Sequence, residues 1–232
     1  MAITTGLYSA IPGSPSSGDL YFPTDSFYDV LFYNGGNSPA SWDHHANGKL
    51  LTTPPSFSWI NQGGASVSST NGGETMVAPT AGGAHQARIR KKAAPSTPYT
   101  VTMACLPTNR GTNSSFGPGP LFRESSSGKL RTLYLAFNTV GLLDATKWTS
   151  PTAPVSALFT TRSESLVSSP LIFFRLEDDG TNRKYHFSGD GINFVQLYSE
   201  GRTVDMTADE IGWFLDPYSQ EQKATLIHWK EA

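Results

Sequence analysis

A run of three carboxylates, Glu177-Asp178-Asp179, is followed directly by Gly180. Two carboxyl groups could cleave a glycosidic bond if they faced each other about 5 to 9 Å apart. Neighbouring residues of a strand instead point to opposite faces of the sheet. Asp-Gly pairs are also typical of tight turns. We therefore interpret residues 178–182 as a turn and predict no catalytic residue in the chain.

Metal binding could use the Asp43-His44-His45 sequence, which contains residue types that zinc accepts as ligands. Adjacent side chains of an extended segment point apart, so a shared ion would need further ligands from elsewhere. We interpret this sequence as a solvated loop. Calcium could be bound if two turns converged, with oxygen ligands from Asp178, Asp179 and Asp190. The spacing does not require such a site, and we predict neither a metal nor a cofactor.

Cysteine chemistry is limited to Cys105, which lies in the apolar run 102–106. A single cysteine excludes an intrachain disulfide and a cysteine-based zinc site, so we predict a buried hydrophobic side chain. The charge balance also narrows the function. The formal net charge is −2 and charged residues make up 16% of the chain. This composition lacks the basic surface that nucleic-acid binding requires, and we predict no nucleic-acid partner.

Aromatic residues are the best candidates for binding, because sugars stack their apolar faces on exposed rings. Trp148 lies at a polar strand end and Tyr218 follows Pro217 in a loop, so either ring could stack on a sugar. Packing is the alternative role of both rings. Polar groups for the sugar hydroxyls would come from the predicted turn, through Asp178, Asp179 and Asn182. The remaining tryptophans after residue 54 lie in strand patterns and are expected in the core: Trp59, Trp213 and Trp229.

One dense basic run, residues 88–92, has the sequence Arg-Ile-Arg-Lys-Lys. On a strand, Arg88, Arg90 and Lys92 share one face. This face could meet an anionic sugar or an acidic subunit. We favour a solvated edge strand whose charges discourage pairing with other chains.

The elements that must position these residues are β-strands. From Phe57 onward, alternating apolar and polar residues are separated by turns, most clearly at Asp179-Gly180 and Asp190-Gly191. A capping-box spelling at residues 207–210 predicts one short helical turn. Expected strands are 57–60, 66–69, 74–77, 87–91, 99–106, 119–123, 129–138, 155–159, 171–177, 183–187, 193–198, 211–215 and 224–229.

The first 54 residues have a different character. Residues 12–18 are rich in proline, glycine and serine and predict an extended arm. Two aromatic runs, 19–23 and 28–33, predict a hairpin too small to fold alone. We expect it to attach the protein to a partner surface through Tyr21, Phe22, Phe32, Tyr33 and Trp42. Thr52-Thr53-Pro54-Pro55 is a stiff boundary, so the domains are predicted as residues 1–54 and 55–232.

Residues 57–229 resemble the concanavalin A-like lectin and glucanase sandwich. The likeness is carried by Ser188-Gly189-Asp190-Gly191-Ile192-Asn193-Phe194, by Glu210-Ile211-Gly212-Trp213-Phe214 and by the final strand 224–229. The resemblance implies an all-β, two-sheet jelly roll preceded by the arm and hairpin module. Glucanases of this fold carry their acidic residues as E-x-D-x-x-E, which is absent here. The expected activity is therefore binding without catalysis.

A second resemblance is to bacteriophage tail and virion proteins. It is carried by Gly18-Asp19-Leu20-Tyr21-Phe22-Pro23-Thr24-Asp25-Ser26, by Leu31-Phe32-Tyr33-Asn34-Gly35 and by residues 57–100. It implies a virion structural protein of a tail fibre, spike or baseplate, made in the host cytoplasm, that displays its sandwich to host surface glycans. The arm would bind other virion proteins, and we expect a homo-oligomer. A capsid decoration protein without a specific receptor and a glycan-cleaving hydrolase are the alternatives.

Targeting and membrane segments are not expected. No stretch approaches the ~20 apolar residues of a membrane helix. The opening Met1-Ala2-Ile3-Thr4-Thr5 lacks the charged and apolar regions of a signal peptide. We therefore expect a protein that does not insert into membranes.

Overall fold

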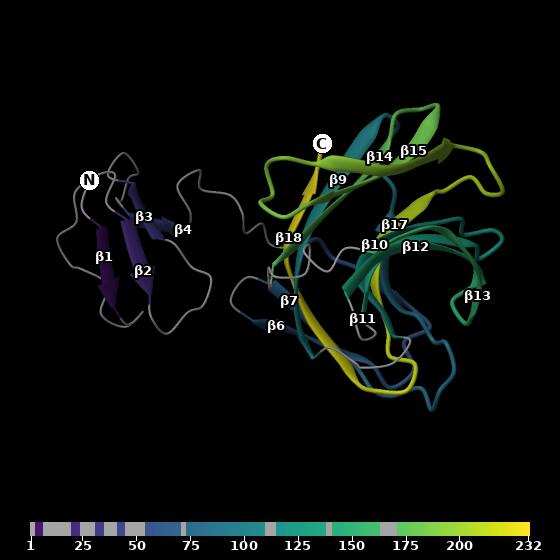
Figure 1. The fold of residues 1–232 in the computed structure, drawn as a ribbon, viewed down its shortest axis with the longest axis horizontal. Coiled ribbons are helices and arrows are strands. Elements are labelled where there is room, and N and C mark those ends of the chain that lie inside the picture. The colour runs from purple at the N-terminus through teal and green to yellow at the C-terminus, as the bar shows by residue number, and fades with distance from the viewer. Residues whose placement is uncertain are drawn as a thin grey trace. The chain divides into compact units, whose positions relative to one another are not determined.

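The computed structural model describes residues 3–6, 20–23, 31–34, 41–44, 54–70, 73–109, 115–137, 141–162 and 171–232. The chain divides into two compact units, Met1–Thr52 and Thr53–Ala232 (Figure 1). Each unit is described by itself. The predicted arm at residues 12–18 and the predicted loop residue His45 lie outside the described residues.

The first unit contains a four-stranded sheet. Its strands are β1 (Ile3–Gly6), β2 (Leu20–Pro23), β3 (Leu31–Asn34) and β4 (Ser41–His44), in that order. β2 and β3 pair antiparallel with Leu20 opposite Phe32, as the predicted hairpin requires. β1 joins β2 in parallel and β4 joins β3 antiparallel, and neither of these strands was predicted. All five aromatic residues predicted for attachment lie in these strands, and their role stays a prediction.

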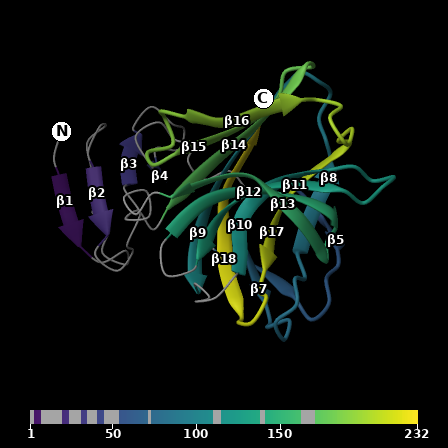
Figure 2. The same ribbon diagram turned by 45° about the vertical axis from the view of Figure 1, so that its right-hand side comes forward.

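The second unit is a sandwich of two antiparallel seven-stranded sheets, and no helix occurs among its described residues (Figures 1 and 2). The all-β, two-sheet jelly roll is thereby confirmed. The first sheet contains, in spatial order, β13 (Ala153–Arg162), β12 (Gly141–Ser150), β11 (Leu130–Phe137), β10 (Ser115–Arg123), β17 (Glu210–Asp216), β8 (Arg88–Ala93) and β5 (Ser58–Ile60). The second contains β16 (Val195–Gly201), β15 (Asn182–Ser188), β14 (Ile172–Asp178), β9 (Tyr99–Asn109), β18 (Gln222–Glu231), β7 (Gly73–Ala78) and β6 (Ser66–Thr70).

Each predicted strand of the sandwich is present, but two local expectations were wrong. β12 was not predicted, because its polar residues hide the alternation of its buried ones. The helical turn predicted at residues 207–210 does not form. Thr207 donates its backbone N–H to Glu124 at 2.6 Å, and the carboxylate of Asp209 accepts from the backbone N–H of Ser125 at 2.7 Å. These contacts to the β10–β11 turn replace the local contacts of a capping box. Across the described residues, no helix is long and apolar enough to span a membrane.

The main apolar core lies between the two sheets. It includes Trp213 of β17, Trp229 of β18 and Cys105 of β9, all buried as predicted. Trp59 is half-buried and packs against this core. A Cβ atom added at Gly212 would lie 2.1 Å from the carbonyl oxygen of Arg90. The central strand β17 therefore approaches β8 too closely for any other residue at this position.

The basic strand β8 is not a solvated edge, because it lies between β17 and β5. Arg90 donates two hydrogen bonds to Glu74 of the second sheet, at 2.9 and 2.8 Å. Lys92 pairs with Glu231 of the same sheet at 2.7 Å. The edge interpretation failed because these charges are neutralised by carboxylates from strands distant in sequence. They join the two sheets of this chain.

Because the ring of Trp213 is packed in the core, removing it should strongly destabilise the protein. The Trp213→Ala variant should lose about 3 to 5 kcal/mol of unfolding free energy, because it creates a large cavity. It also removes the indole N–H that donates to Glu74 at 3.2 Å. Urea denaturation monitored by circular dichroism measures the loss. A value below about 1 kcal/mol would contradict the central position of β17.

The division into two units predicts separable roles. Deleting residues 1–54 should leave residues 55–232 folded, because the main core is built from residues of the second unit. The shortened protein should no longer form oligomers or enter particles. Circular dichroism tests folding, and light scattering with particle incorporation tests assembly. An unfolded product, or a shortened chain that still assembles, would refute the proposed division of roles.

Candidate functional site

A second apolar cluster covers the face of the first sheet that points away from the second sheet. Along β11, Leu133 and Leu135 point into the main core, whereas Leu130, Tyr134 and Ala136 belong to the second cluster. The same alternation along β17 sends Trp213 inward and Phe214 outward. The outer face of this sheet is thus built from aromatic and aliphatic residues.

His85 and Asp216 form the polar centre of this face. The Nδ1 atom of His85 lies 2.6 Å from Oδ2 of Asp216. The other carboxylate oxygen, Oδ1, accepts the backbone N–H of Gln86 at 2.8 Å. Asp216 ends the central strand β17 and is 0% exposed, whereas the His85 side chain is 24% exposed. A buried carboxylate therefore holds an imidazole at the protein surface.

Three aromatic rings surround His85. Its ring stacks on Phe116, with centroids 4.8 Å apart and planes 18° apart. Tyr218 lies 4.7 Å away on a tilted plane, and Trp148 meets the imidazole edge-on at 5.9 Å. We call these five residues the outer-face site: His85, Phe116, Trp148, Asp216 and Tyr218. His85, Phe116 and Tyr218 are partly exposed, so the site offers rings with polar groups beside them.

The loops that carry the site are tied together by backbone hydrogen bonds. The carbonyl oxygen of Tyr218 accepts from the N–H groups of Ala81 and Gly83, at 2.9 and 3.0 Å. Tyr218 has a φ of 42°, which few non-glycine residues adopt. Such a conformation persists where surrounding contacts enforce it. The loop that contains His85 and the turn that follows β17 are therefore held together by these hydrogen bonds.

Polar groups lie beneath the rings. The hydroxyl of Tyr134 lies 2.8 Å from Oγ1 of Thr146, and the indole N–H of Trp148 donates to Oγ1 of Thr132 at 3.0 Å. Burial raises the pKa of Tyr134 far above its usual value, and the negative charges of Asp144 and Asp216 raise this pKa further. Tyr134 therefore keeps its proton at physiological pH. The negative charges of Asp144 and Asp216 thus both act on the phenol of Tyr134 at the outer face.

The structure corrects the prediction for Trp148. This residue is 1% exposed, since it lies inside β12 between β11 and β13. Its ring cannot stack on a sugar. The error follows from the missed strand, which made the polar neighbours of Trp148 resemble a loop. Tyr218, the other predicted ring, is partly exposed beside His85, as a binding residue would be.

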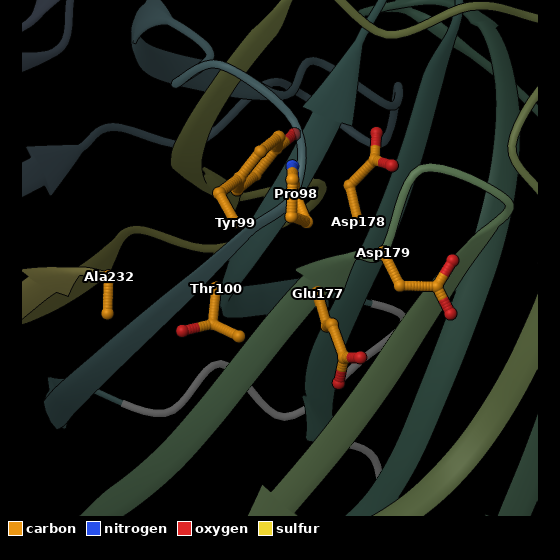
Figure 3. A pocket seen from close by; sticks show the side chains of 7 residues that line it. All are labelled: Pro98, Tyr99, Thr100, Glu177, Asp178, Asp179 and Ala232. Atoms are coloured by element: carbon orange, nitrogen blue, oxygen red, sulfur yellow. The ribbon is translucent and has the colours of Figure 1, made fainter.

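The predicted turn residues lie elsewhere, at one end of the second sheet. Together with Pro98, Tyr99, Thr100, Glu177 and Ala232, Asp178 and Asp179 line a shallow hollow of about 240 Å³ (Figure 3). Figure 3 shows Tyr99 and Asp178 pointing to one side of the sheet, whereas Glu177 and Thr100 point to the other. No exposed ring is available here for stacking, because Tyr99 is buried.

Lysine and arginine side chains pair with the carboxylates of this hollow. Lys184 contacts both Glu177 and Asp179 at 2.8 Å. Its hydrogen bond, with those of the Asn182 and Thr181 backbones, lowers the pKa of Asp179 far below its usual range. Asp178 is buried and pairs with Arg202 at 2.8 Å, so a role in contacting sugar is not available to it. The turn interpretation is confirmed, and sugar contacts by Asp179 and Asn182 stay predictions.

The structure also rules out a calcium site shared by Asp178, Asp179 and Asp190. Asp178 and Asp179 precede β15, whereas Asp190 follows it. A strand of this length separates them by roughly 20 Å, too far for one ion. Asp190 instead accepts the backbone N–H groups of Ile192 and Asn193, both at 2.8 Å. Among the residues that the structure describes, no group of three or more candidate ligands could hold a metal.

Several residues of the outer-face site were missed by sequence reasoning. No local pattern marks His85, since its partner Asp216 lies 131 positions later. Phe116 lies near the start of β10, before the predicted strand 119–123 begins. One local signal was present in Asp216-Pro217-Tyr218, which ends a buried strand with a carboxylate, a proline and an aromatic residue. Such strand ends commonly carry binding residues.

Comparisons with known proteins bear on the fold. No protein-family model matches the chain, and no curated protein matches it in sequence. A functionally unknown protein from Saccharomyces cerevisiae has a TM-score of 0.61 at 12% identity, over 76% of this chain and 96% of that chain. The exoplasmic/lumenal domain of VIP36, in its Ca²⁺/Man3GlcNAc-bound form, has a TM-score of 0.53 at 10% identity, over 78% of this chain and 86% of that chain.

A glycoside-hydrolase protein is also similar. The GH43 protein BlXynB from Bacillus licheniformis has a TM-score of 0.57 at 8% identity. The match covers 95% of this chain but 55% of that chain, so this chain spans about half its length. At such identities the likeness concerns the fold alone. The shared fold is a two-sheet, all-β sandwich.

Because Trp148 is buried, replacing it should lower the stability of the protein. The Trp148→Ala variant should lose about 3 to 5 kcal/mol of unfolding free energy, because the ring leaves a cavity beneath His85. Val155→Ala is the matched control on the neighbouring strand β13, since Val155 is 62% exposed and should change stability by at most about 0.5 kcal/mol. Chemical denaturation of both variants tests this. Equal stability of the two variants would show that Trp148 is not a core residue.

Proposed function

We propose that this chain is a non-enzymatic bacteriophage virion protein of a tail fibre, spike or baseplate that displays a glycan-binding sandwich. The observation that carries the glycan-binding part is the outer-face site. There the partly exposed rings of His85, Phe116 and Tyr218 lie beside the carboxylate of Asp216. Rings that stack and polar groups that bond to hydroxyls are the two requirements of a sugar site. The second sheet's hollow lacks an exposed ring.

The fold supports this proposal without establishing it. VIP36, which shares the fold, has been solved with Man3GlcNAc bound. In the chain itself, Tyr218 and His85 sit on loops that a rigid sheet holds in place, an arrangement typical of binding sites. We expect a single site to bind weakly. Several copies on one particle would supply the avidity needed to hold a host cell.

The virion role rests on the N-terminal sequence. Residues 18–35 resemble modules of phage tail and virion proteins. They form a unit separate from the sandwich, and five aromatic residues lie on its strands. We propose that this unit binds other virion proteins and sister chains, which would make the protein a homo-oligomer located on the virion. A capsid decoration protein without a receptor would use the same attachment unit.

A hydrolase is the alternative from another class, since a glycosidase shares the fold. The non-enzymatic proposal is supported by the state of the outer-face carboxylates. Asp216 is buried and accepts hydrogen bonds from both the His85 ring and the Gln86 backbone. Asp144 bonds to the buried phenol of Tyr134. Asp216, which is 0% exposed, lacks the solvent-facing geometry of a nucleophile or a general base.

A glycan array probed with the assembled full-length protein tests the proposal. We expect selective binding to a subset of glycans, with no release of reducing sugar from any of them. The Tyr218→Ala variant should reduce the signal without unfolding the protein, because Tyr218 is partly exposed. Phe194→Ala is the matched control. Its ring is also partly exposed, but it packs under Arg175 at 3.8 Å on the second-sheet side of the sandwich.

The outcomes separate the candidate functions. Uniformly blank arrays with intact particles would favour the decoration protein. Release of reducing sugar would favour the hydrolase. Binding that Phe194→Ala weakens as much as Tyr218→Ala would move the glycan site away from the outer face.

A further inference from the structure

His85 is held in one orientation by two different kinds of contact. Its Nδ1 atom lies 2.6 Å from the carboxylate of Asp216, and its ring stacks on Phe116. Asp216 is itself held, because its second oxygen accepts the backbone N–H of Gln86. The imidazole therefore presents a defined edge to the surface.

The Asp216 contact also determines where the ring proton sits. A carboxylate accepts hydrogen bonds, so Nδ1 of His85 must be the nitrogen that carries the proton. In a neutral imidazole the other nitrogen then carries a lone pair. Within the part of the chain that the structure describes, Nε2 makes no hydrogen bond, and it is not among the buried unsatisfied atoms. When the ring of His85 is neutral, the outer-face site thus offers a free hydrogen-bond acceptor.

We infer that the outer-face site selects ligands that present a hydrogen-bond donor, namely the hydroxyl or amide groups of neutral sugars. This inference rests on the proposed glycan binding and names the ligand class of the same site. The lone pair of Nε2 accepts a hydroxyl proton and repels an anionic oxygen. The carboxylates of Asp144 and Asp216, which both raise the pKa of Tyr134 on this face, add repulsion of the same sign. Sialylated, phosphorylated and uronic-acid glycans are therefore disfavoured.

The Asp216→Asn variant tests the inference with little change of shape. The amide oxygen can still accept the N–H of Gln86, whereas the amide NH₂ group takes the place of Oδ2. That group donates, so Nδ1 of His85 must become the acceptor and the ring proton must move to Nε2. The same side chain would then offer the ligand a donor. Asp190→Asn is the matched control, because Asp190 lies in the β15–β16 turn, outside the outer-face site.

The ring proton is measured first, by ¹⁵N NMR of the histidine nitrogens in the full-length protein. We expect the proton of His85 on Nδ1 in the wild type and in Asp190→Asn, and on Nε2 in Asp216→Asn. Glycan arrays follow with the same three proteins. The wild type should bind neutral glycans in preference to their sialylated or phosphorylated counterparts. Asp216→Asn should weaken neutral-glycan binding on the order of tenfold, the loss of about one good hydrogen bond, whereas Asp190→Asn should not.

Failure of the inference can be told from failure of the proposed function. A wild-type His85 with its proton on Nε2, or on both nitrogens, overturns the inference whatever the array shows. Preference for anionic glycans overturns it too, as does undiminished neutral-glycan binding by Asp216→Asn once its ring proton has moved. A wild type that binds no glycan overturns the proposed function and the ligand class together, while the NMR result on the ring proton still stands.

Discussion

The pairing of Arg90 with Glu74 is the contact on which the sandwich depends most. Arg90 lies on β8 of the first sheet and Glu74 on β7 of the second, and the carboxylate accepts two guanidinium hydrogen bonds and the indole N–H of Trp213. Removing one member of such a buried pair leaves the other charge unpaired, which typically costs about 3 to 5 kcal/mol. The same contact also orients the largest core residue of β17. Register between the sheets is therefore set by charge as well as by apolar packing.

Buried ions lie on the far side of the core as well. Glu200 of β16 pairs with Arg183 of β15 at 2.9 Å, and Arg131 of β11 in the opposite sheet lies 3.5 Å from the same carboxylate. Apolar residues fill the space between the Arg90–Glu74 pair and the ion pairs of Glu200. Inward-facing polar groups of this kind need partners, because an unpaired buried charge is far more costly than an exposed one. The inner face of the sandwich is thus occupied, so the glycan binding that we propose would use the outer faces or the loops.

The outer face of the first sheet carries aromatic rings because side chains alternate between the two faces of each strand. The alternation that sends Trp213 inward sends Phe214 and Tyr134 outward. There they pack against Trp148 and Phe116, the rings that contact His85. A rigid sheet thus carries a small set of partly exposed rings and one oriented imidazole. Preorganisation of this kind lowers the entropy cost of binding a ligand, which favours the glycan binding that we propose for this site.

The alternation of residues and the Asp-Gly turns were enough to determine the all-β class, most strand positions and the burial of Trp213, Trp229 and Cys105, because these properties depend on near neighbours along the chain. Tyr218 was predicted as a binding residue from its local position after Pro217, and this role stays a prediction. The pairing of β8 with distant strands, the burial of Trp148 and the meeting of His85 with Asp216 were decided by the tertiary structure. Each joins residues far apart in sequence, and a local pattern carries no information about which distant charge or ring will lie opposite.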